Sequence, residues 1–178
     1  MPRYDLPNAA PEPLRLVQRF VNTVDREHGR EWWPTPEALA AWLEEHSLGP
    51  SEPVGEADLS RAVALRAALQ ALMRANGTGG EIPVDAVTTL NREGRGLTLE
   101  LRDDGGVRVA APEAPLAQVV AVALAAMLDG SWSRLKTCRQ CGWAFYDYSR
   151  NRSGSWCSMQ ICGNRLKTRA YRRRRAST

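Results

Sequence analysis

Four cysteines in two close pairs constrain the fold of this chain more than any other feature of its sequence. Two residues separate Cys138 from Cys141, four separate Cys157 from Cys162, and fifteen lie between the pairs. In a protein that keeps its thiols reduced, such pairs are typical of a metal site rather than of disulfides. Four thiolates complete the tetrahedral shell of Zn²⁺ and leave no open position for a reacting water. We therefore predict one structural zinc ion held by these four residues.

The residues around the cysteines predict a small finger. Gly142 follows the first pair and can adopt the left-handed conformation after a zinc knuckle. Residues 143–148 are aromatic and strand-like, and residues 149–155 form a polar turn before the chain returns through 156–158 and enters a helix. Five positions on an ideal helix rotate by about 140°, so one cysteine of the second pair must precede the helix or lie in an irregular turn. Knuckle, hairpin and helix together indicate a treble-clef-like finger. A redox C-x-x-C site is the weaker alternative, because two more cysteines follow and no βαβ pattern surrounds the pair.

Charge is distributed unevenly along the 178 residues. From Arg134 onward the chain carries 12 Lys and Arg residues and one acid, Asp147, whereas the first 133 residues carry a net charge of −7. The overall net charge of +4 hides this asymmetry. A polyanion-binding tail on an acidic body has this pattern.

The basic side chains of the tail are candidate nucleic-acid contacts. A cation every helical turn, with no acid nearby, suits a phosphate backbone, and arginine can also reach guanine edges. Asn164 is expected to cap the helix or to hydrogen-bond a zinc-bound thiolate. The alternative is a solvated basic end that binds polyanions weakly. The candidate contacts are Arg150, Arg152, Arg165, Lys167, Arg169, Arg172 and Arg173.

We expect residues 1–130 to form a mainly helical α+β body with one β-hairpin. Residues 131–178 are expected to form the zinc finger. Residues 25–33 are expected to form a loop. The hairpin is expected where two alternating segments flank residues 103–106. Apolar periodicity and capping signals predict helices over 13–24, 35–45, 56–76, 83–93 and 114–130.

A polar cluster follows the first predicted helix, close to Trp32 and Trp33. One interpretation is a pocket for a small-molecule effector, with polar groups that orient the ligand and aromatic walls. The other is ordinary helix termination, with the tryptophans in the core. The cluster consists of Asn22, Thr23, Asp25, Arg26 and His28.

Motifs of other protein classes are missing from the sequence. It contains no nucleotide-binding glycine loop and no nucleophile elbow, so we expect no catalytic residues and no enzyme. The longest apolar run, residues 119–128, is half of the ~20 residues that a membrane span needs. The N-terminus lacks the apolar stretch of a secretory signal. We expect a cytoplasmic protein with no membrane partner.

Several segments also resemble a known family. Cys162-Gly163-Asn164-Arg165, with Cys138-x2-Cys141-Gly142 and Trp156-Cys157-Ser158-Met159, resembles the signature of CGNR zinc-finger proteins. Upstream, Arg19-Phe20-Val21-Asn22-Thr23 resembles the FVNT motif of the N-terminal ABATE domain of that family. The resemblance covers nearly the whole chain and implies a bacterial, stress-linked transcriptional regulator whose finger binds DNA. The apolar strand that usually precedes FVNT is replaced here, so any first strand should be short or absent.

The leading functional hypothesis is a zinc-dependent regulator that binds duplex DNA. The sequence leaves open whether it also binds a small-molecule effector and whether it forms a homodimer. An RNA- or ribosome-associated protein is one alternative, because phosphate binding does not distinguish the two nucleic acids. A protein-interaction module is another, in which the finger docks a partner through its aromatic residues. Those residues are Trp143, Phe145, Tyr146 and Trp156.

Overall fold

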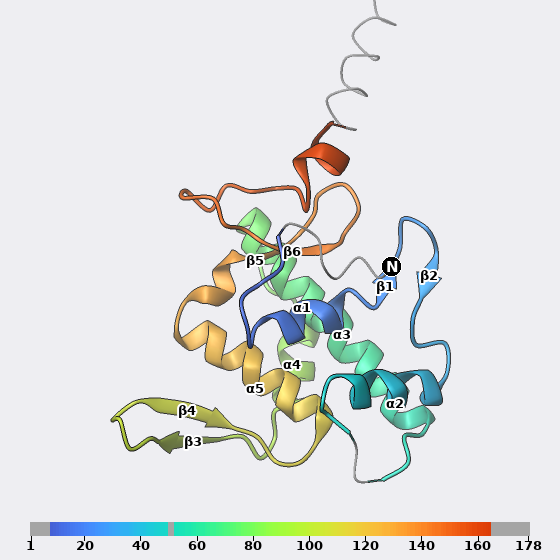
Figure 1. Ribbon diagram of the computed structural model, residues 1–178, viewed down its shortest axis with the longest axis vertical. Helices are drawn as coiled ribbons and strands as arrows, with labels where there is room; N and C mark the ends of the chain where they lie inside the picture. The colour runs from blue at the N-terminus through green and yellow to red at the C-terminus, as the bar shows by residue number, and fades with distance from the viewer. Residues whose placement is uncertain (1–7, 50–51, 165–178) are drawn as a thin grey trace, which may run out of the picture.

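The computed structural model describes residues 8–49 and 52–164 (Figure 1). This part is mainly helical, with three two-stranded antiparallel sheets, and has the α+β body and small C-terminal finger that the sequence predicts. The helices are α1 Arg15–Val21, α2 Pro36–Glu45, α3 Glu56–Thr78, α4 Val84–Glu93 and α5 Pro115–Leu128. The strand pairs are β1 Val24–Asp25 with β2 Arg30–Glu31, β3 Thr98–Leu101 with β4 Val107–Ala110, and β5 Leu135–Thr137 with β6 Ala144–Tyr146.

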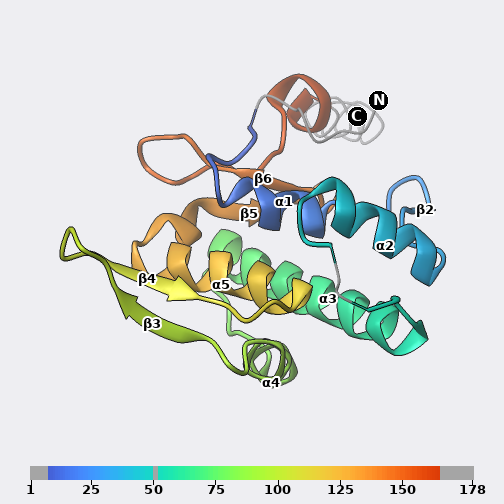
Figure 2. The ribbon, with the colours of Figure 1, turned by 60° about the horizontal axis from the view of Figure 1, so that its bottom comes forward.

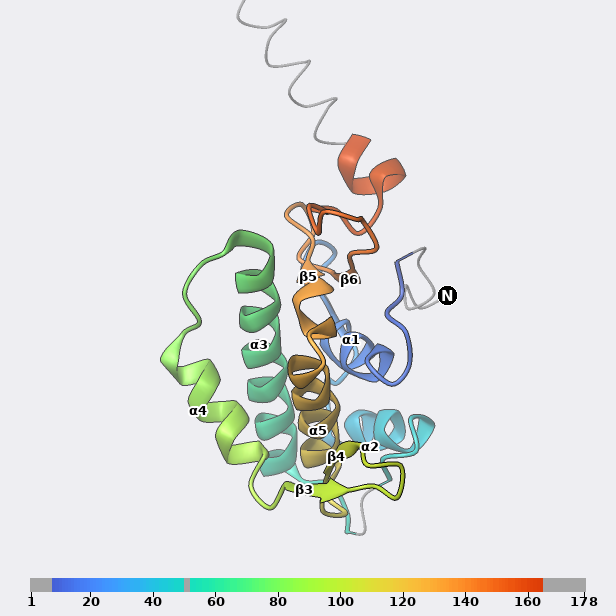
Figure 3. The ribbon, with the colours of Figure 1, turned by 90° about the vertical axis from the view of Figure 1, so that its left-hand side faces the viewer.

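The helices of the body pack around α3 and α5. Helix α1 contacts both of them, and so does α4, so that α3 and α5 lie between α4 and α1 (Figure 3). The β3–β4 hairpin projects from the body (Figure 2), at the end that lies away from the finger in Figure 1. Within the described residues, no helix combines the length and the apolar composition that a bilayer crossing requires.

Local signals in the sequence locate the helices well. Thr35 caps α2, because its hydroxyl accepts a hydrogen bond from Ala38 N at 3.4 Å and Pro36 occupies the first turn. At the start of α3, the Asp58 carboxylate accepts a hydrogen bond from Gly55 N. The predicted hairpin is confirmed as β3–β4. Helix α1 is shorter than the predicted range of 13–24.

The core is built from apolar faces of the five helices α1–α5 and from aromatic side chains. Phe20, Trp33 and Trp42 meet edge to face, with ring centroids 4.9–5.5 Å apart. Val119 and Val120 of α5 are fully buried in the same core, as expected for a helix that is apolar nearly all round.

Two expectations about strands were wrong. Residues 25–33 are not all loop, since β1 and β2 pair there over two residues each. The hairpin expected around the turn 149–155 would pair segment 143–148 with residues 156–158. Instead, strand β6 of this segment pairs with β5, which precedes it in the chain. The segments in these two pairings do not alternate strongly between apolar and polar residues. Hydrophobic periodicity in the sequence therefore does not detect them as strands. The structure shows no strand in residues 8–14, which precede α1, and the expectation of a short or absent first strand extends to residues 1–7, outside the described residues.

The finger hairpin is joined to the body along the outer edge of β6. The Asn22 amide donates to Ala144 O at 2.9 Å and accepts from Ala144 N at 2.7 Å. Gln18, one turn earlier on α1, also donates to Ala144 O, at 3.0 Å. Farther along β6, Tyr146 N donates to Asn8 O. Leu135, Ala144 and Tyr146 belong to the same apolar core as the helices, so the finger and the body share one core.

Replacing Asn22 by Ala should destabilise the whole chain. Ala144 O keeps its hydrogen bond from Gln18, but the buried Ala144 N–H loses the partner described above, which costs about 1–3 kcal/mol. We expect that decrease in the free energy of unfolding, measured by urea denaturation of the zinc-loaded protein. The control is Asn91→Ala on the exposed face of α4, which should change stability by less than about 0.5 kcal/mol. Equal stabilities of the two variants would contradict this role of Asn22.

Candidate metal centre

The first cysteine pair lies in the turn between β5 and β6. Cys138 N donates to Trp143 O at 2.8 Å, and Gly142 N donates to Cys138 O at 2.9 Å, which folds the four-residue turn back on itself. Gly142 has a φ of +74°, the left-handed conformation that the sequence predicted after a knuckle and that glycine adopts without a steric penalty. The hairpin therefore holds both thiols on one side of the turn.

The second pair uses an irregular turn. Cys157 precedes the wide helical turn Met159–Gly163, and Cys162 lies within it, with its N–H donating to Ser158 O at 2.9 Å. This is the solution that the five-residue spacing predicted, because an ideal helix would separate the two side chains. Wide turns of this type are frequent at functional sites.

The four sulfurs form a zinc-binding site. Their Sγ atoms all lie within 4.8 Å of one another. Three of the separations are 3.6–3.7 Å, joining Cys141, Cys157 and Cys162 pairwise. Sulfurs placed tetrahedrally about 2.3 Å from a zinc ion lie roughly 3.8 Å apart. These three separations match this geometry and are far too long for a disulfide.

Electrostatics also favours a cation at the centre of the cluster. Hydrogen bonding to Cys138 raises the pKa of Cys141 to about 12. Burial raises the pKa of Cys162. Without a cation, four buried sulfurs this close cannot all be thiolates, because each negative charge opposes the next. Bound Zn²⁺ supplies the compensating charge, and it has a structural role here because all four positions are filled by protein.

Aromatic side chains enclose the centre. Trp143 and Phe145 of the finger are buried against the sulfurs, and Trp156 is half-buried there. Trp32 comes from the body and packs edge to face on Trp143, at a centroid distance of 6.4 Å. From the sequence, Trp32 was a candidate pocket wall, and no linear signal placed it beside the zinc site.

Comparison with known families agrees with this geometry. A family model named ABATE and described as "Putative stress-induced transcription regulator" matches residues 14–131, about two thirds of the chain. The chain belongs to the ABATE family. A second model, the CGNR zinc finger, matches residues 134–175. No curated protein matches the sequence.

A buried ion pair organises the loop that follows β6 in the CGNR finger. Lys136 Nζ lies 2.8 Å from Asp147 Oδ2, and both side chains are almost inaccessible. The carboxylate also accepts hydrogen bonds from Ser149 N at 3.0 Å and Gly154 N at 2.8 Å. A Cβ atom at Gly154 would lie 2.6 Å from Asp147 Oδ1, so the loop can close on the carboxylate only with glycine there.

This network keeps Asp147 ionised. Burial opposes ionisation, but the hydrogen bonds from Lys136, Ser149 and Gly154 outweigh it and lower the pKa of Asp147 to about 2. Because the folded pKa lies below the unfolded value of about 3.9, the group stabilises the folded state above pH ~4, and this contribution is lost as the pH falls towards 2.

The predicted nucleic-acid contacts are only partly within the described residues. Arg150 and Arg152 lie exposed on the loop ordered by Asp147. Arg152 donates to Ser133 Oγ at 2.8 Å, and its carbonyl accepts a hydrogen bond from Lys136 Nζ. The other predicted contacts lie outside the described residues; they are Arg165, Lys167, Arg169, Arg172 and Arg173.

Asn164, the predicted partner of a zinc-bound thiolate, is the last described residue before the C-terminal segment. Its side chain is exposed, and its Nδ2 lies 3.5 Å from Gln160 O. Its proposed hydrogen bond to a thiolate stays a prediction.

The side chains of the polar cluster after α1 hydrogen-bond mainly to other groups of the protein. Asn22 binds the finger, as described above, and Thr23 Oγ1 accepts from Arg66 Nη1 at 3.0 Å. Asp25 accepts hydrogen bonds from Glu27 N and His28 N, and its Oδ2 lies 2.8 Å from His28 Nδ1.

Arg26, the fifth member of the cluster, makes a long contact of 3.4 Å with Gln70. None of the five residues lines the cavity of about 600 Å³ found elsewhere in the body. A ligand pocket at this cluster stays a prediction.

Removing zinc should unfold the finger and destabilise the body, because the two share one core. Structural zinc contributes several kcal/mol to folding, so we expect the Tm to fall by on the order of 10 °C or more. Treatment with a chelator, followed by metal analysis and thermal unfolding, tests this. Re-addition of zinc should restore the Tm. An unchanged Tm at zero zinc content would contradict a structural role for the metal.

Asp147→Asn should destabilise the protein at pH 7 by about 3–5 kcal/mol, since it leaves Lys136 buried without its counter-charge. Urea unfolding measures this loss. The double variant Asp147→Asn/Lys136→Met removes that charge and should be more stable than Asp147→Asn alone. Asp103→Asn in the exposed β3–β4 turn is the control and should be near neutral. If the double variant is the less stable of the two, the ion pair does not account for the effect.

Proposed function

We propose that this chain is a zinc-dependent transcriptional regulator of the bacterial cytoplasm, that its finger binds duplex DNA, and that it is not an enzyme. Residues 131–178 form the DNA-binding unit in this proposal. Residues 1–130 form the body, which holds a site for a small-molecule effector. Membership of the ABATE family and the CGNR finger support the regulator and the zinc dependence.

The main support for DNA binding is that Asp147 is buried and paired with Lys136. Asp147 is the one acid among the 45 residues from Arg134 onward, which also hold 12 basic residues. Its carboxylate is buried and paired with Lys136, so it neutralises none of the other cations in this segment. The remaining positive charge has no counter-charge within its own segment, which favours binding to a polyanion.

A cleft between the finger and the body supports the same proposal. It has a volume of about 350 Å³ and lies between the end of α3 and the zinc knuckle. Arg74 of α3 and Arg139 of the knuckle line it, together with hydroxyl groups and glycines, and no acidic side chain is among its lining residues. Both arginines are exposed and are available to a phosphate.

The alternative of a protein-docking face has less support. Of the four aromatic residues proposed for it, Trp143, Phe145 and Tyr146 are buried, at 7% exposure or less. RNA binding is the alternative that the charge pattern leaves open, because both nucleic acids carry phosphates.

Selection of a random duplex-DNA library with the zinc-loaded protein tests the function directly. We expect an enriched sequence, bound with an affinity that falls steeply with salt, by about 0.9 logarithmic units per phosphate contact per tenfold change in salt. Anisotropy titrations with duplex RNA and with single strands at matched salt distinguish DNA from RNA.

Arg150→Gln should weaken DNA binding and reduce the salt slope, because it removes an exposed cation of the finger. Arg102→Gln, on the exposed hairpin of the body, is the matched control and should change neither. Affinity that does not vary between low and physiological salt would overturn the proposal. Equal or tighter binding to duplex RNA would replace DNA by RNA as the partner.

A further inference from the structure

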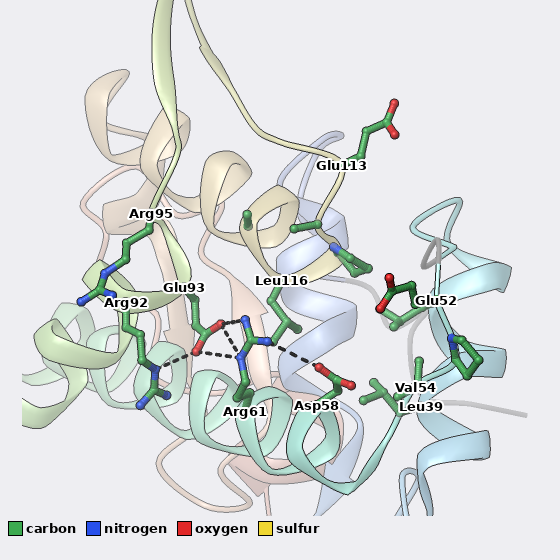
Figure 4. Close-up of a pocket in the computed structure, with 15 residues that line it drawn as sticks. Leu39, Glu52, Val54, Asp58, Arg61, Arg92, Glu93, Arg95, Glu113 and Leu116 are labelled. Atoms are coloured by element: carbon green, nitrogen blue, oxygen red, sulfur yellow. Dashed lines mark hydrogen bonds and ion pairs between the residues drawn. The ribbon is translucent and has the colours of Figure 1, made fainter.

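A cavity of about 600 Å³ (Figure 4) lies at the end of the body that is away from the finger in Figure 1. Its walls come from α2, the first turns of α3, the end of α4 and the start of α5, together with residues 52–54. Pockets for small organic molecules have this size and are usually formed between elements in the same way. The residues that line it are separate from the zinc centre and from the polar cluster after α1.

One wall of the cavity is apolar. Leu39 and Leu43 of α2 and Leu116 of α5 are buried, and Val54 is half-buried beside them. A hydrocarbon or aromatic group placed against this wall would leave water, at a gain of roughly 25 cal/mol per Å² of apolar surface buried.

One end of the cavity is cationic and is held in place by a buried carboxylate. Glu93 accepts hydrogen bonds from Arg61 Nη2 at 2.7 Å and from Arg92 Nε at 2.8 Å. Its side chain has no accessible surface, whereas the two arginine side chains are about half exposed, at 51% and 49%. Glu93 therefore fixes two guanidinium groups at the cavity while its own charge stays covered.

Arg95 adds a third guanidinium group at the same end. It is exposed and lies beside Arg92 (Figure 4). Asp58 contacts Arg61 at 3.4 Å, so three cations face two acids there. The other acids of the lining, Glu52 and Glu113, lie across the cavity from the arginines (Figure 4). The cavity is thus cationic at one end and acidic at the other, with the apolar wall between them.

The start of α5 contributes charge of the same sign as the arginines. Pro115, Leu116 and Ala117 line the cavity, and no side chain caps the helix at Ala114. The positive end of the dipole of this 14-residue helix therefore borders the space that the arginines face.

We propose that this cavity binds a small organic anion with an apolar body. The anionic group, a carboxylate, sulfonate or phosphate, pairs with Arg92 and Arg95, and the apolar body packs on Leu39, Leu43 and Leu116. As the effector site of a regulator, the cavity rests on the proposed function; as a binding site it does not depend on DNA binding.

Two fluorescent dyes test the proposal on the full, zinc-loaded chain without any DNA. The anionic dye 8-anilinonaphthalene-1-sulfonate has an apolar body and a sulfonate, and N-phenyl-1-naphthylamine is a neutral relative. We expect one saturable site for the anionic dye. Arg95→Gln should weaken its binding by roughly tenfold or more, as loss of a charge-assisted hydrogen bond does, and should leave binding of the neutral dye within about twofold of the original.

Val54→Trp, which places a large side chain in the cavity, should abolish binding of both dyes. Arg102→Gln removes an exposed arginine far from the cavity and should affect neither dye. Circular dichroism confirms that each variant is folded. The proposal is overturned if the anionic dye shows no saturable site, or if it binds Arg95→Gln and Val54→Trp as tightly as the unchanged protein. Because DNA is not involved, such a failure would leave the proposed DNA binding untouched.

Discussion

The pair of hydrogen bonds between the Asn22 amide and the Ala144 peptide joins the two parts of this protein. A two-stranded hairpin such as β5–β6 leaves one edge of each strand open. The side chain of Asn22 occupies that edge of β6 as a neighbouring strand would, donating to the carbonyl group of Ala144 and accepting from the N–H group of the same residue. Gln18 reaches the same carbonyl from four residues earlier, because positions i and i+4 lie on one face of a helix. The FVNT segment thus has a physical role here: it carries the amide that recognises the backbone of the finger.

The zinc centre stabilises more than the finger because of this junction. The metal fixes the knuckle, the knuckle fixes β5 and β6, and Leu135 and Tyr146 of these strands belong to the core of the body. In the other direction, Trp32 of the body packs against Trp143 beside the sulfurs. A finger of about 40 residues has little core of its own. In this chain the missing apolar contacts are provided by the body, so that zinc binding and folding of the body are coupled.

Local features of the fold could be predicted from the sequence, and features made by distant residues could not. The Thr35 cap, the left-handed Gly142 and the zinc ligands follow from short spacings, each of which has its own physical reason. The pairing of β5 with β6, the position of Trp32 and the use of Asn22 by the finger have no such signal, because in each case the partner is chosen by tertiary packing. Arg61 and Glu93 illustrate the same limit: they are 32 residues apart, and only the packing of α3 against α4 creates the cavity wall. The contacts proposed for Arg165 and Arg169 lie outside the described residues and depend on the sequence alone.

Two carboxylates have matching roles at opposite ends of the molecule. Asp147 is buried against Lys136 in the finger, and Glu93 is buried against Arg61 and Arg92 in the body. In both places the acid is covered, its pKa is lowered by the cations it pairs with, and neighbouring arginines remain exposed. Each covered carboxylate therefore cancels one positive charge and positions its cationic partners, and the cations in excess of it are left for an incoming anion. Helix α3 runs between the two places: Arg61 lies near its start, and Asn76 near its end donates to the carbonyl groups of Trp132 and Leu135. The two residues are fifteen positions apart on the helix, which corresponds to a rise of about 22 Å. One helix thus connects the proposed anion cavity to the first strand of the finger.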